Sequence, residues 1–408
     1  MTLTRRPDRA GGASPSGPTP GRGGRRSGRT SVVARLLGSE RAGEWLVLVP
    51  AALLALLGVA MVYSASTVET VTDGHASWSV LARQVAYLAG AVGAAFVVSR
   101  IPLRIWRDRL VFPVYAAAVG AMVTLFVAAH VLHVDGLAVS ANGATRWLAV
   151  GPVQFQPSEL AKPALVLWLA RLLSTRGNRI DDRDLLIPVL VGFAVLAVLV
   201  LSGDDLGTTV LLGLVMLTML YLSGAPTRTV VGLGGAMAGL GIGALLLLDG
   251  FRLKRLAAFL HPEKYRLTEA WQLHQSQIGL ASGGLFGVGP GYSRAKWGYL
   301  GTEAHTDFIL AVIGEELGLV GVLFVIVCFV AVMVGGSIIA SRCEDQFGRL
   351  VAFGVTAWLG LQALINIGVT VGTLPTKGIT LPFVSFGGSS LLVSMVGLGL
   401  LLSVARDR

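Results

Sequence analysis

Five ionisable side chains fall within sixteen residues of the stretch "EAHTDFILAVIGEELG", Glu303 to Gly318. Asp307 stands at the start of an apolar run, where its carboxylate could accept a proton from a sugar hydroxyl or hold a divalent cation over a diphosphate. Its alternative role is structural, because a carboxylate in a first helical turn is favoured by the helix dipole. Glu315 and Glu316 lie about 12 to 14 Å farther along such a helix. Carboxylates in a bilayer cost at least about 2.5 to 3.5 kcal/mol each, so we expect this pair to face a polar cavity or a cationic partner.

Two other segments carry polar residues between apolar runs. "GATRWLAVGPVQFQPSELAKP" contains the cation Arg146, followed by Glu159 and Lys162 one helical turn apart. That last pair is either a ligand-binding pair or a structural salt bridge. "TLPTKGITLPFVSFGGSS" contains Lys377 and Ser385; a turn explains its prolines but does not explain the lysine.

The composition predicts a membrane protein. Of 408 residues, 53% are hydrophobic and only 14% are charged, which is typical of a polytopic membrane chain. The net charge of +10 does not predict a nucleic-acid partner, because nine arginines and two acids in residues 1–41 supply +7 of it. Residues 1–42 are rich in Gly, Pro and Ser and are predicted to be a disordered basic cytoplasmic tail. The two cysteines predict neither a disulfide framework nor a metal site.

The predicted fold class is an all-α polytopic membrane protein with about ten transmembrane helices in residues 43–405. Hydropathy places the spans near 43–64, 80–99, 110–130, 157–173, 185–201, 205–223, 228–249, 308–339, 350–371 and 385–404. The fifth and sixth spans could also form one long helix, because only "SGDD" separates them. Basic residues gather on one side of the ten-span arrangement, which predicts that both termini are cytoplasmic.

This topology places a long loop, residues 250–307, on the outer face between the seventh and eighth spans. The loop is basic although outer loops are usually depleted of Lys and Arg, and Arg252, Arg255 and Lys296 are among its cations. These residues either form a solvated surface or bind an anionic, lipid-borne ligand through diphosphate oxygens. Its glycine-rich part, "ASGGLFGVGPGYS", lacks a phosphate-loop pattern and is predicted to be an irregular, re-entrant segment lining a cavity.

The motifs "RWLAVGPVQFQPSELAKPALV", "ASGGLFGVGPGYSRAKWGYL", "EAHTDFILAVIGEELGLVG" and "NIGVTVGTLPTKGITLPFVSFGGSS" resemble the SEDS family of bacterial shape, elongation, division and sporulation proteins. The resemblance extends over about residues 45–405. "IGEELG" and "LPTKG" are more similar to the cell-division member than to the elongation member. Two segments depart from the family pattern. "LGTEAH" has Gly301 and Thr302 where a proline is usual. "GDDLGT" matches the pattern at Asp205 but departs from it at Gly203 and Asp204.

The resemblance implies a peptidoglycan glycosyltransferase that polymerises lipid II at the outer face of the bacterial cytoplasmic membrane, at the division septum. It implies a class B penicillin-binding protein and other division proteins as partners. The family's essential aspartate falls on Asp307. Its other polar and glycine-rich motif positions fall on Arg146, Glu159, Lys162, Lys377, Gly387 and Gly388.

The implied mechanism uses Asp307 as the base and cations to stabilise the leaving diphosphate. No cofactor is required by the pattern, although a divalent cation, Mg²⁺ or Mn²⁺, could share that role. Three alternatives remain: a lipid II flippase, an elongation or sporulation type of polymerase, and a pure scaffold of the division machinery. Polymer formation from lipid II by the purified protein discriminates the enzyme from the flippase and the scaffold.

Overall fold

A computed structural model describes residues 41–72, 76, 78–132, 136–141, 144–151, 153–175, 183–248, 257–297, 299–376 and 378–407. Nearly all of the predicted tail, residues 1–42, lies outside this part of the chain. The described residues are mostly helical, as the composition predicts. The helices are α2 (Ala42–Thr72), α3 (Ser79–Arg100), α4 (Leu103–Ile105), the π-helical η1 (Trp106–Leu110), α5 (Val111–His130), α6 (Pro157–Thr175), α7 (Arg183–Ser202), α8 (Leu206–Leu222), α9 (Thr227–Leu248), α11 (Trp271–Ser282), the 3-10 turn η2 (Gly301–Ala304), α12 (Ile309–Arg342), α13 (Gln346–Val371) and α14 (Gly388–Arg406).

Within the described residues, seven helical segments are long and apolar enough to cross a membrane. They are Ala42–Thr67, Ser79–Arg100, Leu103–His130, Asp184–Ser202, Ile309–Arg342, Gln346–Val371 and Gly388–Arg406. Helix α8 is apolar but shorter, and α6 carries a buried Glu and Lys in its first two turns. These helices, with α6, α8 and α9, fall on the ten spans expected from the sequence.

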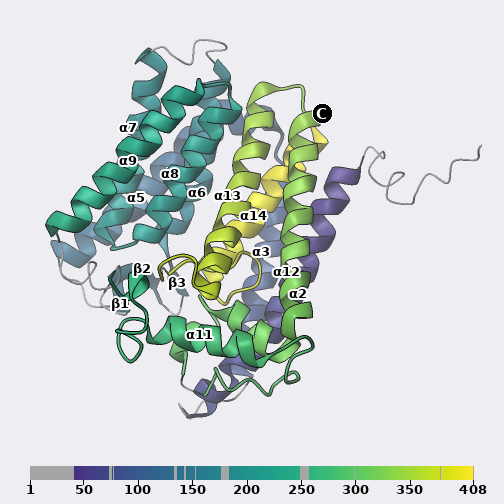
Figure 1. Ribbon diagram of the computed structural model, residues 1–408. Coiled ribbons are helices and arrows are strands. Elements are labelled where there is room, and N and C mark those ends of the chain that lie inside the picture. Colours follow the sequence, from purple (N-terminus) through teal and green to yellow (C-terminus); the bar gives the residue numbers. More distant parts are fainter. Residues whose placement is uncertain are drawn as a thin grey trace, which may run out of the picture. The chain divides into compact units, whose positions relative to one another are not determined.

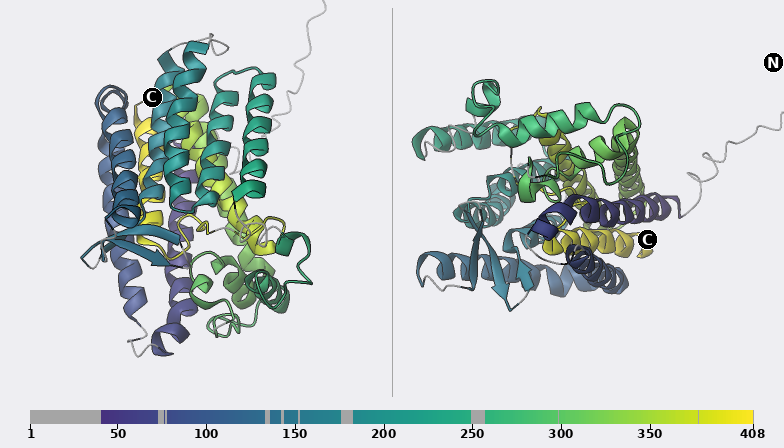
Figure 2. Two further views of the ribbon diagram at one scale, coloured as in Figure 1. Left: turned by 90° about the vertical axis from the view of Figure 1, so that its left-hand side faces the viewer. Right: turned by 90° about the horizontal axis from the view of Figure 1, so that it is seen from below.

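The helices pack side by side around α13, which contacts α6, α8, α12 and α14 (Figure 1). Helix α12 also packs along α2, and α14 packs along α3. The sheet and α11 lie at one end of the helices, and the C-terminus lies at the other end (Figures 1 and 2). Most buried side chains in these helices are apolar, and many are alanines, which allow the helices to approach closely.

The expectation of an all-α chain is wrong in one segment. Strands β1 (Ala138–Ala141), β2 (Ala144–Val150) and β3 (Val153–Phe155) form an antiparallel sheet in the order β1-β2-β3, with Leu148 opposite both Ala138 and Phe155. The sequence contains the signal for the first hairpin, because Asn-Gly at 142–143 lies between β-branched and aromatic residues. A hydropathy window detects long helices and passes over three such short strands.

Helices α7 and α8 are separate, which decides between the two arrangements left open by the sequence. Asp204 has a left-handed φ of 59°, which a continuous helix cannot contain. Asp205 then caps α8, because its Oδ1 accepts a hydrogen bond from the Thr208 amide at 2.9 Å. The four-residue "SGDD" segment is therefore a real helix break.

Helix α12 contains a kink at Gly318 (φ 70°, ψ −165°). A Cβ at this position would lie 2.4 Å from the Gly287 amide nitrogen and 2.5 Å from the Leu285 carbonyl oxygen. The glycine-rich segment pairs with the kink through its backbone: the Val288 and Gly289 amides donate to the Glu315 and Glu316 carbonyls, at 2.9 and 3.1 Å. The expected irregular segment is therefore held by helix backbone opened at the kink.

Candidate active site

Asp307 lies in the turn between η2 and α12, and two other segments fix the backbone of this turn. The Asn366 amide Nδ2 of α13 donates to the Asp307 carbonyl at 2.8 Å and to the Ile379 carbonyl at 2.7 Å. The Ser385 hydroxyl donates to the Thr306 carbonyl at 2.6 Å and accepts from the Leu381 amide at 2.8 Å. The turn is therefore tied to α13 and to the segment before α14.

Arg146 of β2 lies near the Asp307 carboxylate. A Cβ built on Gly378 would be 3.1 Å from one Arg146 guanidinium nitrogen and 3.4 Å from Asp307 Oδ2, so both groups border the same glycine. The guanidinium also donates to the Gly203 carbonyl at 3.3 Å and to the Asp204 carbonyl at 2.6 Å. Arg146 is thus held by the break between α7 and α8, and Gly378 leaves the space that both charged groups use.

The pKa of Asp307 is raised from 3.8 to about 7. Removal of the carboxyl from water is the largest cause, and the negative charges of Glu303 and Asp205 act in the same direction. The positive charge of Arg146 opposes them. The residue as a whole is half-buried. A carboxyl with this pKa, next to a cation, is suited to general base catalysis near neutral pH.

Glu159 and Lys162 form the salt bridge that the sequence left as one alternative. The Lys162 ammonium donates to Glu159 Oε2 at 2.7 Å and to Gln362 Oε1 at 2.9 Å, and the residue is 2% exposed. Gln362 in turn donates to the Thr380 carbonyl at 2.9 Å, and it accepts from the Trp358 indole at 2.8 Å. This cluster joins α6 to α13 and to the segment before α14. Its hydrogen bonds therefore fix the position of that segment relative to the two helices.

Glu315 and Glu316 do have polar and cationic partners, as their cost in an apolar helix requires. Glu315 accepts hydrogen bonds from the Ser293 hydroxyl and from the Arg294 and Ala295 amides at 2.9 and 3.1 Å. Glu316 accepts from the Ser64 hydroxyl at 2.7 Å and pairs with Lys296 at 3.3 Å.

The Lys296 ammonium lies within 3.3 Å of Ser64 Oγ, the Gly291 carbonyl and Glu316 Oε1, and the residue is buried. The sequence predicts that Lys296 binds a ligand, whereas in the structure its ammonium group donates hydrogen bonds to three groups of the same chain.

The remaining predicted ligand residues, Arg252, Arg255 and Lys377, lie outside the described residues. Lys377 directly precedes Gly378 in the sequence, and Gly378 borders the Asp307 and Arg146 side chains. The sequence motifs do not single out Asn366 and Gln362. Their signal is an amide side chain inside an otherwise apolar helix, where an unsatisfied amide would be costly.

A divalent cation would find few ligands in the chain itself. The described residues contain no group of three or more His, Cys, Asp or Glu side chains placed to hold a metal ion. Both oxygens of the Asp205 carboxylate are already used, by the Thr208 amide and the Ser158 hydroxyl. Asp307 and Glu303 are a second pair of acidic residues whose charges influence each other. Such a pair fits Mg²⁺, which is commonly held by one or two carboxylates together with substrate phosphates.

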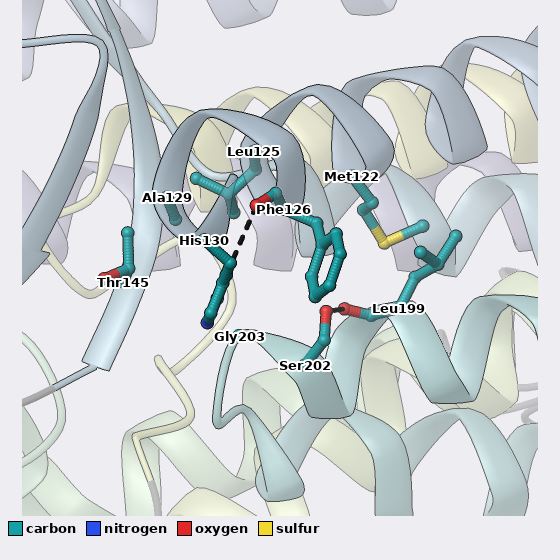
Figure 3. A pocket seen from close by; sticks show the side chains of 9 residues that line it. All are labelled: Met122, Leu125, Phe126, Ala129, His130, Thr145, Leu199, Ser202 and Gly203. Carbon is teal, nitrogen blue, oxygen red and sulfur yellow. Dashed lines mark hydrogen bonds between the residues drawn. The ribbon is translucent and has the colours of Figure 1, made fainter. Parts of the chain in front are cut away.

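A small pocket lies beside this site, between the C-terminal ends of α5 and α7 and strand β2 (Figure 3). Figure 3 shows Phe126, His130 and Ser202 around it, and the Gly203 whose carbonyl accepts from Arg146 also lines it. Its lining is mostly apolar and includes neither Asp307 nor Arg146. The pocket therefore borders the back of the Arg146 anchor and is separate from the carboxylate.

Comparison with known proteins identifies the family. The model of the family described as cell cycle protein, which covers FtsW, RodA and SpoVE, matches residues 44–408. The chain belongs to this family. It is 36% identical to a probable peptidoglycan glycosyltransferase FtsW of Geobacter sp. (strain M18) over 89% of this chain and 96% of that protein. It is 37% identical to the protein of the same name from Coxiella burnetii, with the same coverage of both chains.

Solved structures agree with this family. A chain from a structure described as "Structural coordination of polymerization and crosslinking by a peptidoglycan synthase complex" superposes with a TM-score of 0.71 at 28% identity, covering 89% of this chain and 97% of that one. The crystal structure of the rod shape determining protein RodA of Thermus thermophilus gives a TM-score of 0.64 at 28% identity, with the same coverage. The arrangement of helices in this chain is therefore that of the family.

Proposed function

We propose that this protein is a peptidoglycan glycosyltransferase that polymerises lipid II at the outer face of the cytoplasmic membrane during cell division. The observation that carries the proposal is the Asp307 carboxyl, with its pKa near 7, beside Arg146 at the end of the helices that also holds the sheet and α11. Two relatives that this chain matches over almost their whole length are named probable peptidoglycan glycosyltransferase FtsW, and these names support the same activity and a role in division.

The proposed reaction follows from the charges at this site. Asp307 takes the proton from the C4 hydroxyl of the GlcNAc of an acceptor lipid II while that oxygen attacks the anomeric carbon of MurNAc on the donor chain. A β-1,4 bond forms with inversion, and the bond to the undecaprenyl diphosphate breaks. Arg146 stabilises the negative charge that develops on the diphosphate. Lys377, Arg252 and Arg255 are proposed to act with it.

Four other predicted ligand residues are proposed to position this machinery. Ser385 holds the turn at Thr306, and the Glu159–Lys162 pair holds the segment that carries Gly378 through Gln362 and Thr380. Lys296 holds the glycine-rich loop. A bound Mg²⁺ or Mn²⁺, with Asp307 and Glu303 as its ligands from this chain, would neutralise part of the diphosphate charge.

We further propose ten spans, with both termini in the cytoplasm and residues 250–307 outside. The sheet and α11 lie at the end opposite the C-terminus, which supports this orientation. The proposed partner is a class B penicillin-binding protein, at the division septum together with other division proteins. The superposition on a chain of a peptidoglycan synthase complex supports such a partner.

The test is polymer formation from purified lipid II by the purified full chain, alone and with a class B penicillin-binding protein. The wild type should form glycan in at least one of these arms. Asp307→Asn should reduce the rate by about 10² to 10⁴-fold, while the matched control Glu263→Gln, an exposed carboxyl in the same loop, should leave it unchanged. Movement of lipid II across vesicles without polymer in either arm would favour the flippase and overturn the proposal.

A further inference from the structure

The glycine-rich loop is firmly held on its inner side. Backbone hydrogen bonds join Gly284 and Leu285 to the amides of Leu319 and Val320, at 2.9 and 3.2 Å. The Glu315 and Glu316 carboxylates of α12 accept hydrogen bonds from backbone amides farther along the loop. The buried Lys296 ammonium forms an ion pair with Glu316 at 3.3 Å. The conformation of this loop is therefore set by the chain itself.

The same loop turns large apolar side chains outward. Phe286 is 80% exposed and Tyr292 is 75% exposed. The Tyr292 ring lies against Gly289, where a Cβ would be 3.4 Å away, so it stays close to the part of the loop that pairs with α12. We call the exposed side chains Leu285, Phe286, Val288, Tyr292, Leu319 and Val320 the loop patch. The loop patch is therefore an exposed apolar surface on a loop of fixed conformation, and surfaces of this kind mark interaction sites.

The loop patch continues the outward face of a membrane-spanning helix. Beyond the kink, α12 exposes Leu323, Phe324 and Val327. In a helix apolar enough to cross a membrane, this exposed face is the one that contacts lipid. The pairing of Leu285 with Val320 sets the loop side chains next to the outer end of that face.

The length of α12 places the loop patch at the membrane boundary. From Leu319 to Arg342 the helix is about 36 Å long at 1.5 Å per residue, which already exceeds the roughly 30 Å of a bilayer's hydrocarbon core. With Arg342 at the inner surface, the orientation proposed above, Leu319 lies near the outer boundary. Glu315 and Glu316 then lie at or above that boundary, shallower than a continuous helix starting at Asp307 would place them.

We propose that the loop patch inserts into the outer leaflet of the membrane and anchors the glycine-rich loop there. Aromatic side chains favour this depth, because their rings sit among lipid headgroups and acyl chains. Arg294, exposed in the same loop, supplies a cation for lipid phosphates. The anchor holds the loop at the surface where a lipid-borne substrate travels, about three helical turns from the Asp307 end of α12.

Spin labels at single cysteines test this insertion in the full chain, reconstituted in nanodiscs of phosphatidylglycerol and phosphatidylethanolamine. Cys328 and Cys343 are buried and are first replaced by alanine. Phe286→Cys carries the label, Glu263→Cys is the water-exposed control and Leu323→Cys the lipid-exposed control. Insertion predicts that the label at 286 is relaxed by oxygen and protected from a water-soluble nickel chelate, as at 323.

Two results would overturn the proposal. Nickel accessibility at 286 equal to that at 263 would place the loop patch in water, as a surface free to dock a protein partner. Protection from both reagents would mean contact with protein, such as a second copy of the chain. Neither measurement uses catalysis, so loss of the anchor and loss of the proposed glycosyltransferase activity are separate outcomes.

Discussion

The rate of lipid II polymerisation should rise about tenfold between pH 6 and pH 8. Asp307 must be ionised to accept a proton, and its pKa is about 7. A base with that pKa is about 9% ionised at pH 6 and about 91% ionised at pH 8. The direction follows from the role: a general acid with the same pKa would lose activity over this range.

Two neighbours should move this profile in opposite directions. Glu303→Gln removes a negative charge that raises the pKa of Asp307, so the rise in rate should shift to lower pH. Arg146→Gln removes a positive charge that lowers this pKa, so the rise should shift to higher pH. The maximal rate should also fall in Arg146→Gln, because the leaving diphosphate loses a partner.

The assay is initial polymerisation rate against pH with purified protein, at saturating lipid II and constant ionic strength. Asp307→Asn sets the background. A wild-type rate independent of pH between 6 and 8, or two shifts in the same direction, would refute the assignment of Asp307 as the titrating base. Complete loss of activity in Glu303→Gln would move the role of base to Glu303.

The raised pKa of Asp307 also makes the stability of the folded protein depend on pH. The folded carboxyl binds its proton more tightly than the unfolded one, whose pKa is near 3.8. Its contribution to stability is therefore fully present below about pH 3.8 and is lost as pH rises through about 7. Asp307→Asn cannot ionise, so it should unfold at a higher temperature than the wild type at pH 8, and the gap should narrow at pH 5. A wild type more stable than this variant at pH 8 would contradict the reasoning.

Three further predictions concern packing and positioning. Lys296→Met leaves a buried carboxylate of α12 without its cation and should cost about 3 to 5 kcal/mol, whereas Arg266→Met, in an exposed pair, should change the unfolding free energy by less than about 1 kcal/mol in denaturant titrations. Gly318→Ala should lower the melting temperature, because φ is 70° and backbone atoms lie within 2.5 Å of the new Cβ; Gly241→Ala, with nothing within 4 Å, should not lower it. Asn366→Leu removes the donor that joins the catalytic turn to α13 and should lower kcat more than it changes KM, and an unchanged kcat would refute this role.

The helices of this protein could be predicted because their signal is local. The expected span 350–371 corresponds to α13 (Gln346–Val371), and the expected span 308–339 corresponds to α12 (Ile309–Arg342). A helix in a bilayer must satisfy its backbone within itself and must be apolar over about 20 residues. Both requirements are met within one contiguous stretch, so a window along the chain detects them.

The candidate base was also visible in the sequence, because a carboxylate beside a basic loop is rare in so apolar a chain. Its pKa could not be predicted, since it depends first on burial of the carboxyl and then on the charges of Glu303, Arg146 and Asp205, the last two of which come from other segments. Asn366 and Gln362 were missed for the same reason. Each is an ordinary amide in the sequence, and only the fold brings to it the carbonyls of other segments.

The buried charges separate local from tertiary information most clearly. The residue types at Glu315 and Glu316 already required polar partners, because isolated charges in an apolar environment are costly. Which partners they have was decided by packing: Ser64 lies 252 positions away along the chain, and Lys296 reaches Glu316 only because the loop folds back onto the kink of α12. Contacts between distant segments depend on how whole helices pack together, and no pattern within a single segment contains that arrangement.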